Sequence, residues 1–297
     1  MTIHALHKCE DGHSYEAFAH YTANATGTVN VSEDPSLGGT YSGVEQMGLL
    51  WSVRPVPGSK PGVRLRKVNV QTPMEVTISV YQGHQTEGFM DQVPLVGVLV
   101  ERWYMAPGIR RIPITEDGLT ATLFLPSGPG PFPGLLDLWG GEGKLIEYRA
   151  ALLASHGIAC LTLDYLTPEI TMETGKMVDS QYIEVGRLQC PLLLVVGEDD
   201  QNWPAYESAM DMKEMMEKAG NSHLLTVLSY LNAGHLIEPP YTPHTRATAF
   251  CSAASVEEVM ALWGGETVAH SRTQEDAWKK MLTFLKENLY GSSNCVF

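Results

Sequence analysis

The chain has 297 residues, a length that accommodates two domains of ordinary size. Its formal net charge of −14 argues against a nucleic-acid partner, because polyphosphate would be repelled overall. The five cysteines are scattered and form no CxxC pair, which favours a reducing compartment over a disulfide framework or a zinc site. No apolar run approaches the roughly 20 residues that a membrane span requires. We expect neither a metal nor a cofactor.

Targeting signals are not evident at either end of the sequence. Residues 1–13 lack a basic region followed by an apolar stretch, so we expect no signal peptide, and no clear mitochondrial presequence is present. The final SSNCVF is not a peroxisomal tripeptide, and Cys295 is one position too late for a prenylation box. These features predict a cytoplasmic protein.

One segment departs from the acidic balance. Residues 54–67 contain five basic residues and no acidic one. The segment could meet a phosphorylated ligand, or it could be a solvated loop and strand edge.

The first part of the chain is predicted to be rich in β-structure. Short runs of Val, Tyr, Thr and Phe are separated by Gly, Pro, Asn and Asp, a pattern typical of a small antiparallel sandwich. We expect one domain over residues 1–112, with a junction at 106–118. The predicted strands are 14–23, 28–32, 67–71, 74–81 and 93–105.

Strands and helices alternate over residues 113–297, which predicts a second domain built on a mainly parallel sheet. Gly157 and Gly220 stand where helices should end. The predicted strands are 119–126, 132–139, 158–165, 191–197 and 224–230, and the predicted helices are 145–157, 171–185, 204–220 and 273–291.

Asp200 and His235 follow two successive predicted strands, at the end of the sheet where functional groups collect. An acid followed by a histidine is the chain order of α/β-hydrolases, in which the nucleophile precedes both. His235 would take the proton of the nucleophile, and Asp200 would orient and stabilise the imidazole. Taken singly, the histidine could be structural and the acidic pair merely solvated.

The segment DLWGGEG, residues 137–143, also follows a strand and opens a helix. Backbone N–H groups near Trp139, Gly140 and Gly141 could form half of an oxyanion hole, where donors are typically worth a few kcal/mol. The alternative is a tight turn that requires glycine for its backbone alone.

The nucleophile itself is missing, because neither G-x-S-x-G nor G-x-C-x-G occurs in the sequence. A complete fold would need roughly 75 residues between Asp164 and Asp200, at average element and loop lengths. The two residues are only 36 positions apart. Two strands and two helices, including the nucleophile turn, therefore have no room.

Three other residues could in principle substitute for the nucleophile. Ser180 is in or beside the preceding helix, and Cys190 lies at the amino end of its strand, far from His235. Cys160 begins a buried strand and has the character of a core residue. None is favoured, so the nucleophile is left unassigned.

Several longer stretches share the pattern of one known family. They are TATLFLPSGPGPFPGLLDLWGGEGKLIEYRAALLASHGIACLTLDYL, VGEDDQNW, AGHLIEPPY, LWGGETVAHSRTQEDAWKKMLTFL and, nearer the start, YSGVEQMGLLWSV. Together they resemble the family of acyl-CoA thioesterases and bile acid-CoA:amino acid N-acyltransferases. The resemblance implies an immunoglobulin-like β-sandwich followed by an α/β-hydrolase domain. It implies hydrolysis of fatty acyl-CoA to free acid and CoA, or transfer of the acyl group to glycine or taurine. By this similarity Asp200 and His235 fall on the triad acid and base.

The sequence departs from the family pattern in two places. Another strand or two is expected before LHKCEDGHSYEAF, and the segment near 180–190 lacks the nucleophile turn and its neighbouring strands. We therefore expect an incomplete parallel sheet without its central strands. The expected function is a fatty acyl-CoA thioesterase whose activity is in doubt. The alternatives are a catalytically dead form and an N-acyltransferase relative. The oligomeric state is left open.

Overall fold

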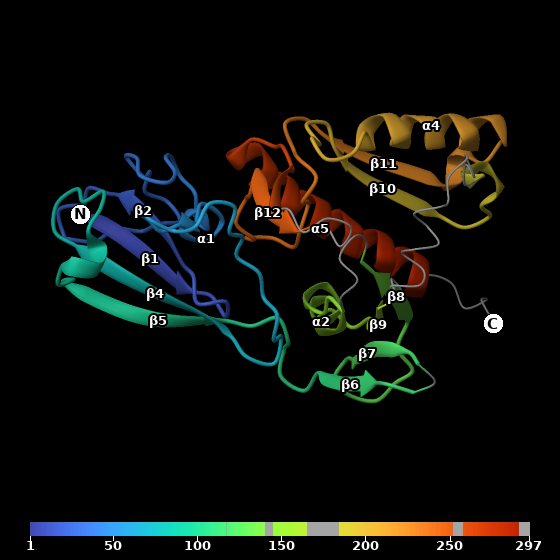
Figure 1. Ribbon diagram of the computed structural model, residues 1–297, viewed down its shortest axis with the longest axis horizontal. Helices are drawn as coiled ribbons and strands as arrows, with labels where there is room; N and C mark the ends of the chain where they lie inside the picture. The colour runs from blue at the N-terminus through green and yellow to red at the C-terminus, as the bar shows by residue number, and fades with distance from the viewer. Residues whose placement is uncertain (117, 140–144, 165–183, 252–257, 291–297) are drawn as a thin grey trace. The chain divides into compact units, whose positions relative to one another are not determined.

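The computed structural model describes residues 1–116, 118–139, 145–164, 184–251 and 258–290 (Figure 1). The described residues fall into two compact units. The first unit draws on Met1–Arg66, Met74–Glu101 and Val185–Phe284, and the second on Lys67–Pro73, Arg102–Glu184 and Leu285–Phe297. Segments far apart in the sequence thus join one unit. Among the described residues, no helix combines the length and the apolar character that crossing a membrane requires.

A five-stranded sheet forms the amino-terminal part of the first unit, in the order β3-β2-β1-β4-β5. β1 pairs antiparallel with both β2 and β4, and β2 pairs antiparallel with β3. The bounds of its strands are β1 Thr2–Lys8, β2 Ser14–His20, β3 Arg54–Pro55, β4 Met74–Tyr81 and β5 Val96–Arg102.

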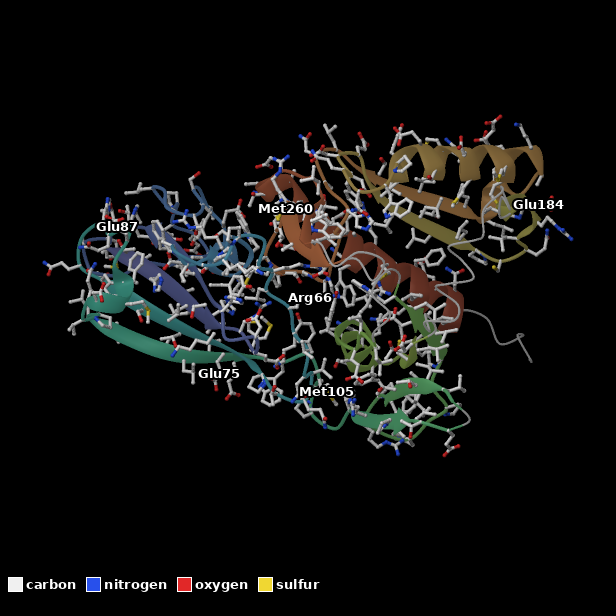
Figure 2. All side chains as sticks on the ribbon, in the orientation of Figure 1. Arg66, Glu75, Glu87, Met105, Glu184 and Met260 are labelled. Atoms are coloured by element: carbon white, nitrogen blue, oxygen red, sulfur yellow. The ribbon has the colours of Figure 1, made fainter. Side chains whose placement is uncertain are left out.

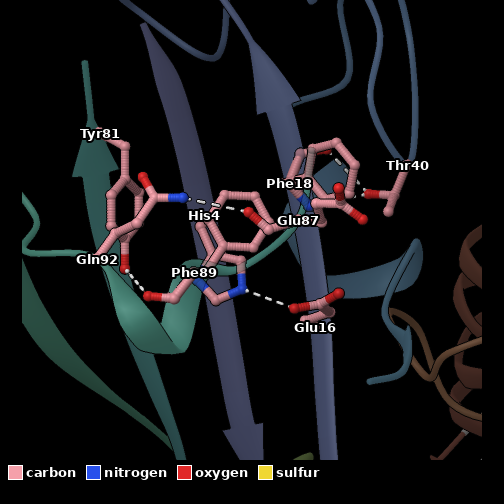
Figure 3. Close-up of polar contacts among 8 residues, drawn as sticks. All are labelled: His4, Glu16, Phe18, Thr40, Tyr81, Glu87, Phe89 and Gln92. Carbon is pink, nitrogen blue, oxygen red and sulfur yellow. Dashed lines mark hydrogen bonds and ion pairs between the residues drawn. The ribbon is translucent and has the colours of Figure 1, made fainter. Parts of the chain in front are cut away.

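Buried side chains lie on both faces of the strands β1, β2 and β4, because successive residues of a strand point to opposite faces. One face carries the main core, which includes Ile3 and Ala17 and packs against Trp51 of the short helix α1, Gly48–Trp51. On the other face His4 stacks on Phe89, with ring centroids 4.1 Å apart. Figure 3 shows this second cluster.

The polar contact in the second cluster joins His4 to Glu16. Nε2 of His4 lies 3.1 Å from Oε2 of Glu16, and both side chains are buried. Phe89 belongs to the 3₁₀ turn η1, Phe89–Asp91. Its carbonyl oxygen accepts a hydrogen bond from the hydroxyl of Tyr81. The turn thereby closes over the sheet.

The predicted strands at 14–23, 74–81 and 93–105 are confirmed as β2, β4 and β5, whereas those at 28–32 and 67–71 are wrong. Both of the latter contain an asparagine that bonds to nearby backbone. Oδ1 of Asn30 accepts the N–H of Ser32, and Oδ1 of Asn69 accepts the N–H of Gln71. Such local bonds offer the backbone an alternative to a strand ladder.

The second unit contains a four-stranded sheet in the order β6-β7-β9-β8. β8 and β9 are parallel, as predicted, while β6–β7 and β7–β9 are antiparallel. The segment expected to be a junction contains β6. The bounds are β6 Arg110–Ile114, β7 Thr120–Leu125, β8 Gly134–Leu138, α2 Tyr148–Ser155 and β9 Ala159–Asp164.

The carboxyl-terminal part of the first unit contains the parallel pair β10–β11 and a hairpin, β12–β13, which the sequence pattern does not predict. Met260, labelled in Figure 2, lies on β13. The predicted helix at 171–185 falls almost wholly outside the described residues. The bounds are η2 Val185–Arg187, β10 Leu192–Gly197, α4 Ala205–Lys218, η3 Ser222–Leu224, β11 Leu225–Tyr230, β12 Ala247–Cys251, β13 Glu258–Leu262 and α5 Thr267–Tyr290.

Candidate catalytic dyad

The two strands that precede Asp200 and His235 end side by side. β10 and β11 pair in parallel with an unbroken register from Leu192↔Leu225 to Gly197↔Tyr230. Their carboxyl ends therefore lie at the same edge, and the loops that follow them meet.

Asp200 and His235 are in direct contact at this edge. Nδ1 of His235 lies 2.8 Å from Oδ2 of Asp200. A carboxylate can only accept, so the hydrogen is on Nδ1, and the lone pair of the neutral ring is on Nε2. The Asp200 side chain is 4% exposed and that of His235 is 32% exposed. The pair thus has a buried acid and an accessible imidazole, the arrangement that a general base requires.

The second oxygen of Asp200 is held by its own loop. Oδ1 accepts the backbone N–H groups of Asn202 and Trp203, at 2.8 and 3.0 Å. These bonds fix the rotation of the carboxylate, so that Oδ2 faces the imidazole.

Trp263, just after β13, supports His235 from a third segment. Its carbonyl oxygen accepts the backbone N–H of His235 at 2.8 Å. The two rings are stacked, with centroids 5.4 Å apart and planes at 23°. The imidazole is therefore held in position through both its backbone and its ring.

Glycines allow these loops to approach closely. Gly264 has φ +73°, and a Cβ there would overlap the carbonyl oxygen of Asp199. The N–H of Gly265 donates to Oδ2 of Asp199 at 2.8 Å, and this bond, with a second one from Gln201, lowers the pKa of the Asp199 carboxyl. The two neighbouring acids thus have different partners. Asp199 joins two loops, and Asp200 orients the histidine.

His270, in the first turn of α5, contacts the backbone on both sides of His235. Its Nδ1 accepts the N–H of Gly234 at 3.0 Å, and its Nε2–H donates to the carbonyl of Leu236 at 2.7 Å. Neither His270 nor Trp263 is predicted from the sequence. A histidine inside a helical pattern and a tryptophan before a glycine pair carry no catalytic signal of their own.

The candidate oxyanion segment lies in the second unit. Trp139 follows β8, and the guanidinium of Arg149 lies 5.2 Å from its ring centroid. Gly140 and Gly141 lie outside the described residues. The oxyanion role of all three remains a prediction.

The candidate nucleophiles differ in their surroundings. Cys160 is fully buried, and burial raises the pKa of its thiol to about 12, which makes it a poor nucleophile. Cys190 is exposed but precedes β10, so about 20 Å of strand separates it from the end where His235 lies. Ser180 lies outside the described residues. Within the described part of the chain, no hydroxyl or thiol forms a hydrogen bond with Nε2 of His235.

The basic segment 54–67 is partly engaged inside the protein. Arg64 forms an ion pair with Glu238, and the two side chains are 10% and 7% exposed. Arg54 lies over the ring of Phe18. For these two arginines the geometry favours the structural alternative over a ligand contact.

The residues that the structure describes include no group of three or more His, Cys, Asp or Glu side chains that could hold a metal ion.

Comparison of the sequence with known proteins shows the family of this chain. Residues 1–116 match the family model "Acyl-CoA thioester hydrolase/BAAT N-terminal region", and residues 162–291 match "BAAT / Acyl-CoA thioester hydrolase C terminal". The chain is 30% identical to acyl-coenzyme A thioesterase 1 of Rattus norvegicus, over 100% of this chain and 92% of the rat protein. It is 31% identical to bile acid-CoA:amino acid N-acyltransferase of Mus musculus, over 97% of this chain and 91% of that protein.

A third relative is the peroxisomal succinyl-coenzyme A thioesterase of Mus musculus, 29% identical over 97% of this chain and 90% of that protein. The alignment with the rat thioesterase runs over 397 positions, 100 more than the 297 residues of this chain. At least that many positions of the rat protein therefore have no counterpart here.

Proposed function

Because the chain belongs to the acyl-CoA thioester hydrolase and BAAT family, we propose that it is a thioesterase that hydrolyses fatty acyl-CoA to free fatty acid and CoA. Asp200 and His235 are the triad acid and base in this proposal. The observation that carries it is the 2.8 Å contact between the two side chains at the ends of neighbouring parallel strands. Named relatives include several acyl-coenzyme A thioesterases.

The proposed reaction uses water directly, because no nucleophilic side chain meets Nε2 of His235 in the described part of the chain. Nε2 takes a proton from water as the oxygen attacks the thioester carbonyl carbon. The carbonyl π electrons move to oxygen, where hydrogen-bond donors would stabilise the charge of the intermediate. On collapse, the C–S bond breaks and His235 returns the proton to the sulfur. Asp200 stabilises the imidazolium between these steps.

This route is expected to be slow. Without an acyl-enzyme intermediate, one difficult step is no longer divided into two easier ones. A histidine pair with backbone donors can still leave a residual rate over water.

The proposed architecture is a β-sandwich domain over residues 1–112 and an α/β-hydrolase domain over 113–297, with central strands missing near 180–190. The two family matches support this division in outline. The separate sheets β6-β7-β9-β8 and β10–β11, which share no strand among the described residues, are consistent with an incomplete hydrolase sheet.

We also propose a cytoplasmic location and a role in fatty acid metabolism. Some relatives carry peroxisomal or mitochondrial names.

A second candidate is a protein that binds acyl-CoA without turning it over. It is favoured by the absence of G-x-S-x-G and G-x-C-x-G from the sequence and by the missing 100 positions. Transfer to glycine or taurine is a third candidate, favoured by the N-acyltransferase relative. That reaction calls for the same missing nucleophile, so hydrolysis is the simpler proposal.

The deciding experiment measures thiol release from palmitoyl-CoA by the purified, monodisperse chain. His235→Ala should abolish release, whereas His223→Ala, at an exposed histidine in η3, should leave it unchanged. Equal rates for both variants would overturn the assignment of His235. No release, together with micromolar binding of a non-hydrolysable acyl-CoA thioether, would establish the second candidate. Faster thiol release with taurine, and formation of an acyl-taurine, would establish the third.

A further inference from the structure

We propose that His270 is a positioning residue that holds the main chain of residues 234–236, and so aims the imidazole of His235 at Asp200. The proposal rests on the proposed function only in taking His235 as the catalytic base. Positioning can be measured in a chain that turns over no substrate.

Both hydrogen bonds of the His270 ring end next to His235. Gly234, one residue before it, donates its N–H to Nδ1 at 3.0 Å, and Leu236, one residue after it, accepts from Nε2–H at 2.7 Å. One rigid ring therefore joins the peptide groups 233–234 and 236–237, which lie just outside the two peptide groups of His235 itself. A shift of either peptide would carry the Cα of His235 with it.

The two partners of the ring allow only one protonation state. A backbone N–H can only donate and a carbonyl oxygen can only accept, so His270 must be neutral with its hydrogen on Nε2. The ring is 1% exposed, and burial together with the neighbouring His244 lowers its pKa to about 4. The bridge is therefore intact at neutral pH.

The surroundings keep the ring from rotating. The ring of His244 packs against it, with centroids 4.4 Å apart, and Nε2–H of His244 donates to the carbonyl of Gly265 at 3.1 Å. His270 itself begins the regular helical bonding of α5, because its N–H donates to the carbonyl of Glu266 at 2.8 Å. The bridge is thus anchored in a helix rather than in a loop.

The bridge completes the support of His235. Trp263 supports its backbone N–H and its ring face, and Asp200 holds Nδ1. His270 bonds to the main chain on both sides of the base, whereas Trp263 bonds to the N–H of His235 itself, and the carbonyl of Leu236 also accepts the N–H of Glu238. Groups that catalyse must be held to within about 0.5 Å by such supporting contacts.

The test is NMR of the full chain with ¹⁵N-labelled histidines, in which the Nδ1–H signal of His235 is assigned by its loss in His235→Ala. His270→Leu removes both bridging bonds. We expect the Nδ1 proton of His235 to exchange with water at least tenfold faster in this variant, or to broaden beyond detection. His270→Asn keeps an acceptor for Gly234 and should show an intermediate rate.

The matched control is Ser271→Ala, the next residue on α5. Ser271 is also buried, and its hydroxyl bonds only to the helix carbonyl of Thr267. Exchange at His235 should be unchanged in this control. A folded His270→Leu protein with wild-type exchange would overturn the proposal. Failure of both His270 variants to fold would also overturn it, because His270 would then be a general requirement of the core.

Where thiol release is measurable, His270→Leu should lower kcat with little change in KM. Loss of the His235 signal without any turnover in the wild type would support the positioning role while contradicting the proposed thioesterase. The two proposals therefore fail separately.

Discussion

Asp200 selects the tautomer of His235, because its carboxylate accepts the hydrogen from Nδ1 and the lone pair of the neutral ring is then on Nε2. This pairing could be predicted from the sequence, since an acid and a histidine that follow neighbouring parallel strands must meet at one edge. The supporting residues could not. Trp263 and His270 reach the site from a hairpin end and a helix, and local patterns do not report such contacts.

The first prediction concerns Asp200→Asn. The asparagine amide can donate as well as accept, so it also allows the tautomer of His235 with the hydrogen on Nε2. In that tautomer Nε2 has no lone pair and cannot take a proton. We expect thiol release to fall by at least about a hundredfold, with little change in the unfolding midpoint. Asp211→Asn, on the exposed face of α4, is the control. Equal loss in both variants would mean that the charge of Asp200 has no specific role.

The second prediction concerns acid stability. The pKa of His270 is lowered from 6.5 to about 4 by burial, so the unfolded chain takes up a proton that the folded chain resists. The free energy of unfolding should therefore fall as pH drops from 6.5 to 4, by on the order of 3 kcal/mol from this residue, and be unaffected above 6.5.

Urea unfolding at pH 7, 5.5 and 4 measures this effect, with His270→Asn as the comparison. The variant should lose less stability than the wild type over the same range. Parallel pH profiles for the two proteins would contradict the assignment of the effect to His270.

Among the elements, long apolar runs were the reliable signal. β9, β10 and β11 were all predicted, because a nearly continuous apolar run is the sequence pattern of a strand buried on both faces. β1 was missed, since His4 and His7 occupy buried positions and hide its alternation. The hairpin β12–β13 was missed as well. The error at β1 arises because tertiary packing buries polar residues that the local pattern places outside, whereas β13 exposes Val259, Met260 and Leu262.

The third prediction concerns the turn between β13 and α5. Gly264→Ala forces a left-handed backbone and also drives a methyl group into the carbonyl of Asp199. Gly58→Ala imposes the same kind of backbone at φ +86°, but nothing lies within 4 Å of the added carbon. We expect Gly58→Ala to cost about 1 kcal/mol and Gly264→Ala at least about 2 kcal/mol more, in chemical denaturation. Equal costs would show that the close approach is relieved without strain.

At the scale of the whole molecule, two sheets end in strands with exposed apolar side chains. β8 ends the four-stranded sheet with Leu136 and Leu138 exposed, at 52% and 43%. β5 ends the five-stranded sheet, and Val96 and Val98 on it are 61% and 57% exposed. Apolar end strands of this kind invite association with other chains. The proposed loss of strands could be inferred from the spacing in the sequence, but not how the remaining sheets end.

The fourth prediction follows from these ends. The chain should melt at a lower temperature, and less cooperatively, than a complete relative such as the rat thioesterase. Differential scanning calorimetry of both proteins measures the midpoint and the ratio of calorimetric to van't Hoff enthalpy. A midpoint as high and a ratio as close to one as in the complete relative would contradict the proposed loss of central strands.

The ring stacking between His235 and Trp263 also has an optical consequence. A protonated imidazole in contact with an indole quenches its fluorescence by accepting an electron, whereas a neutral one quenches weakly. The emission of Trp263, obtained as the difference between the wild type and Trp263→Phe because the chain has six tryptophans, therefore follows the charge of His235. The fluorescence of Trp263 thus reports the charge of His235 without substrate, label or turnover.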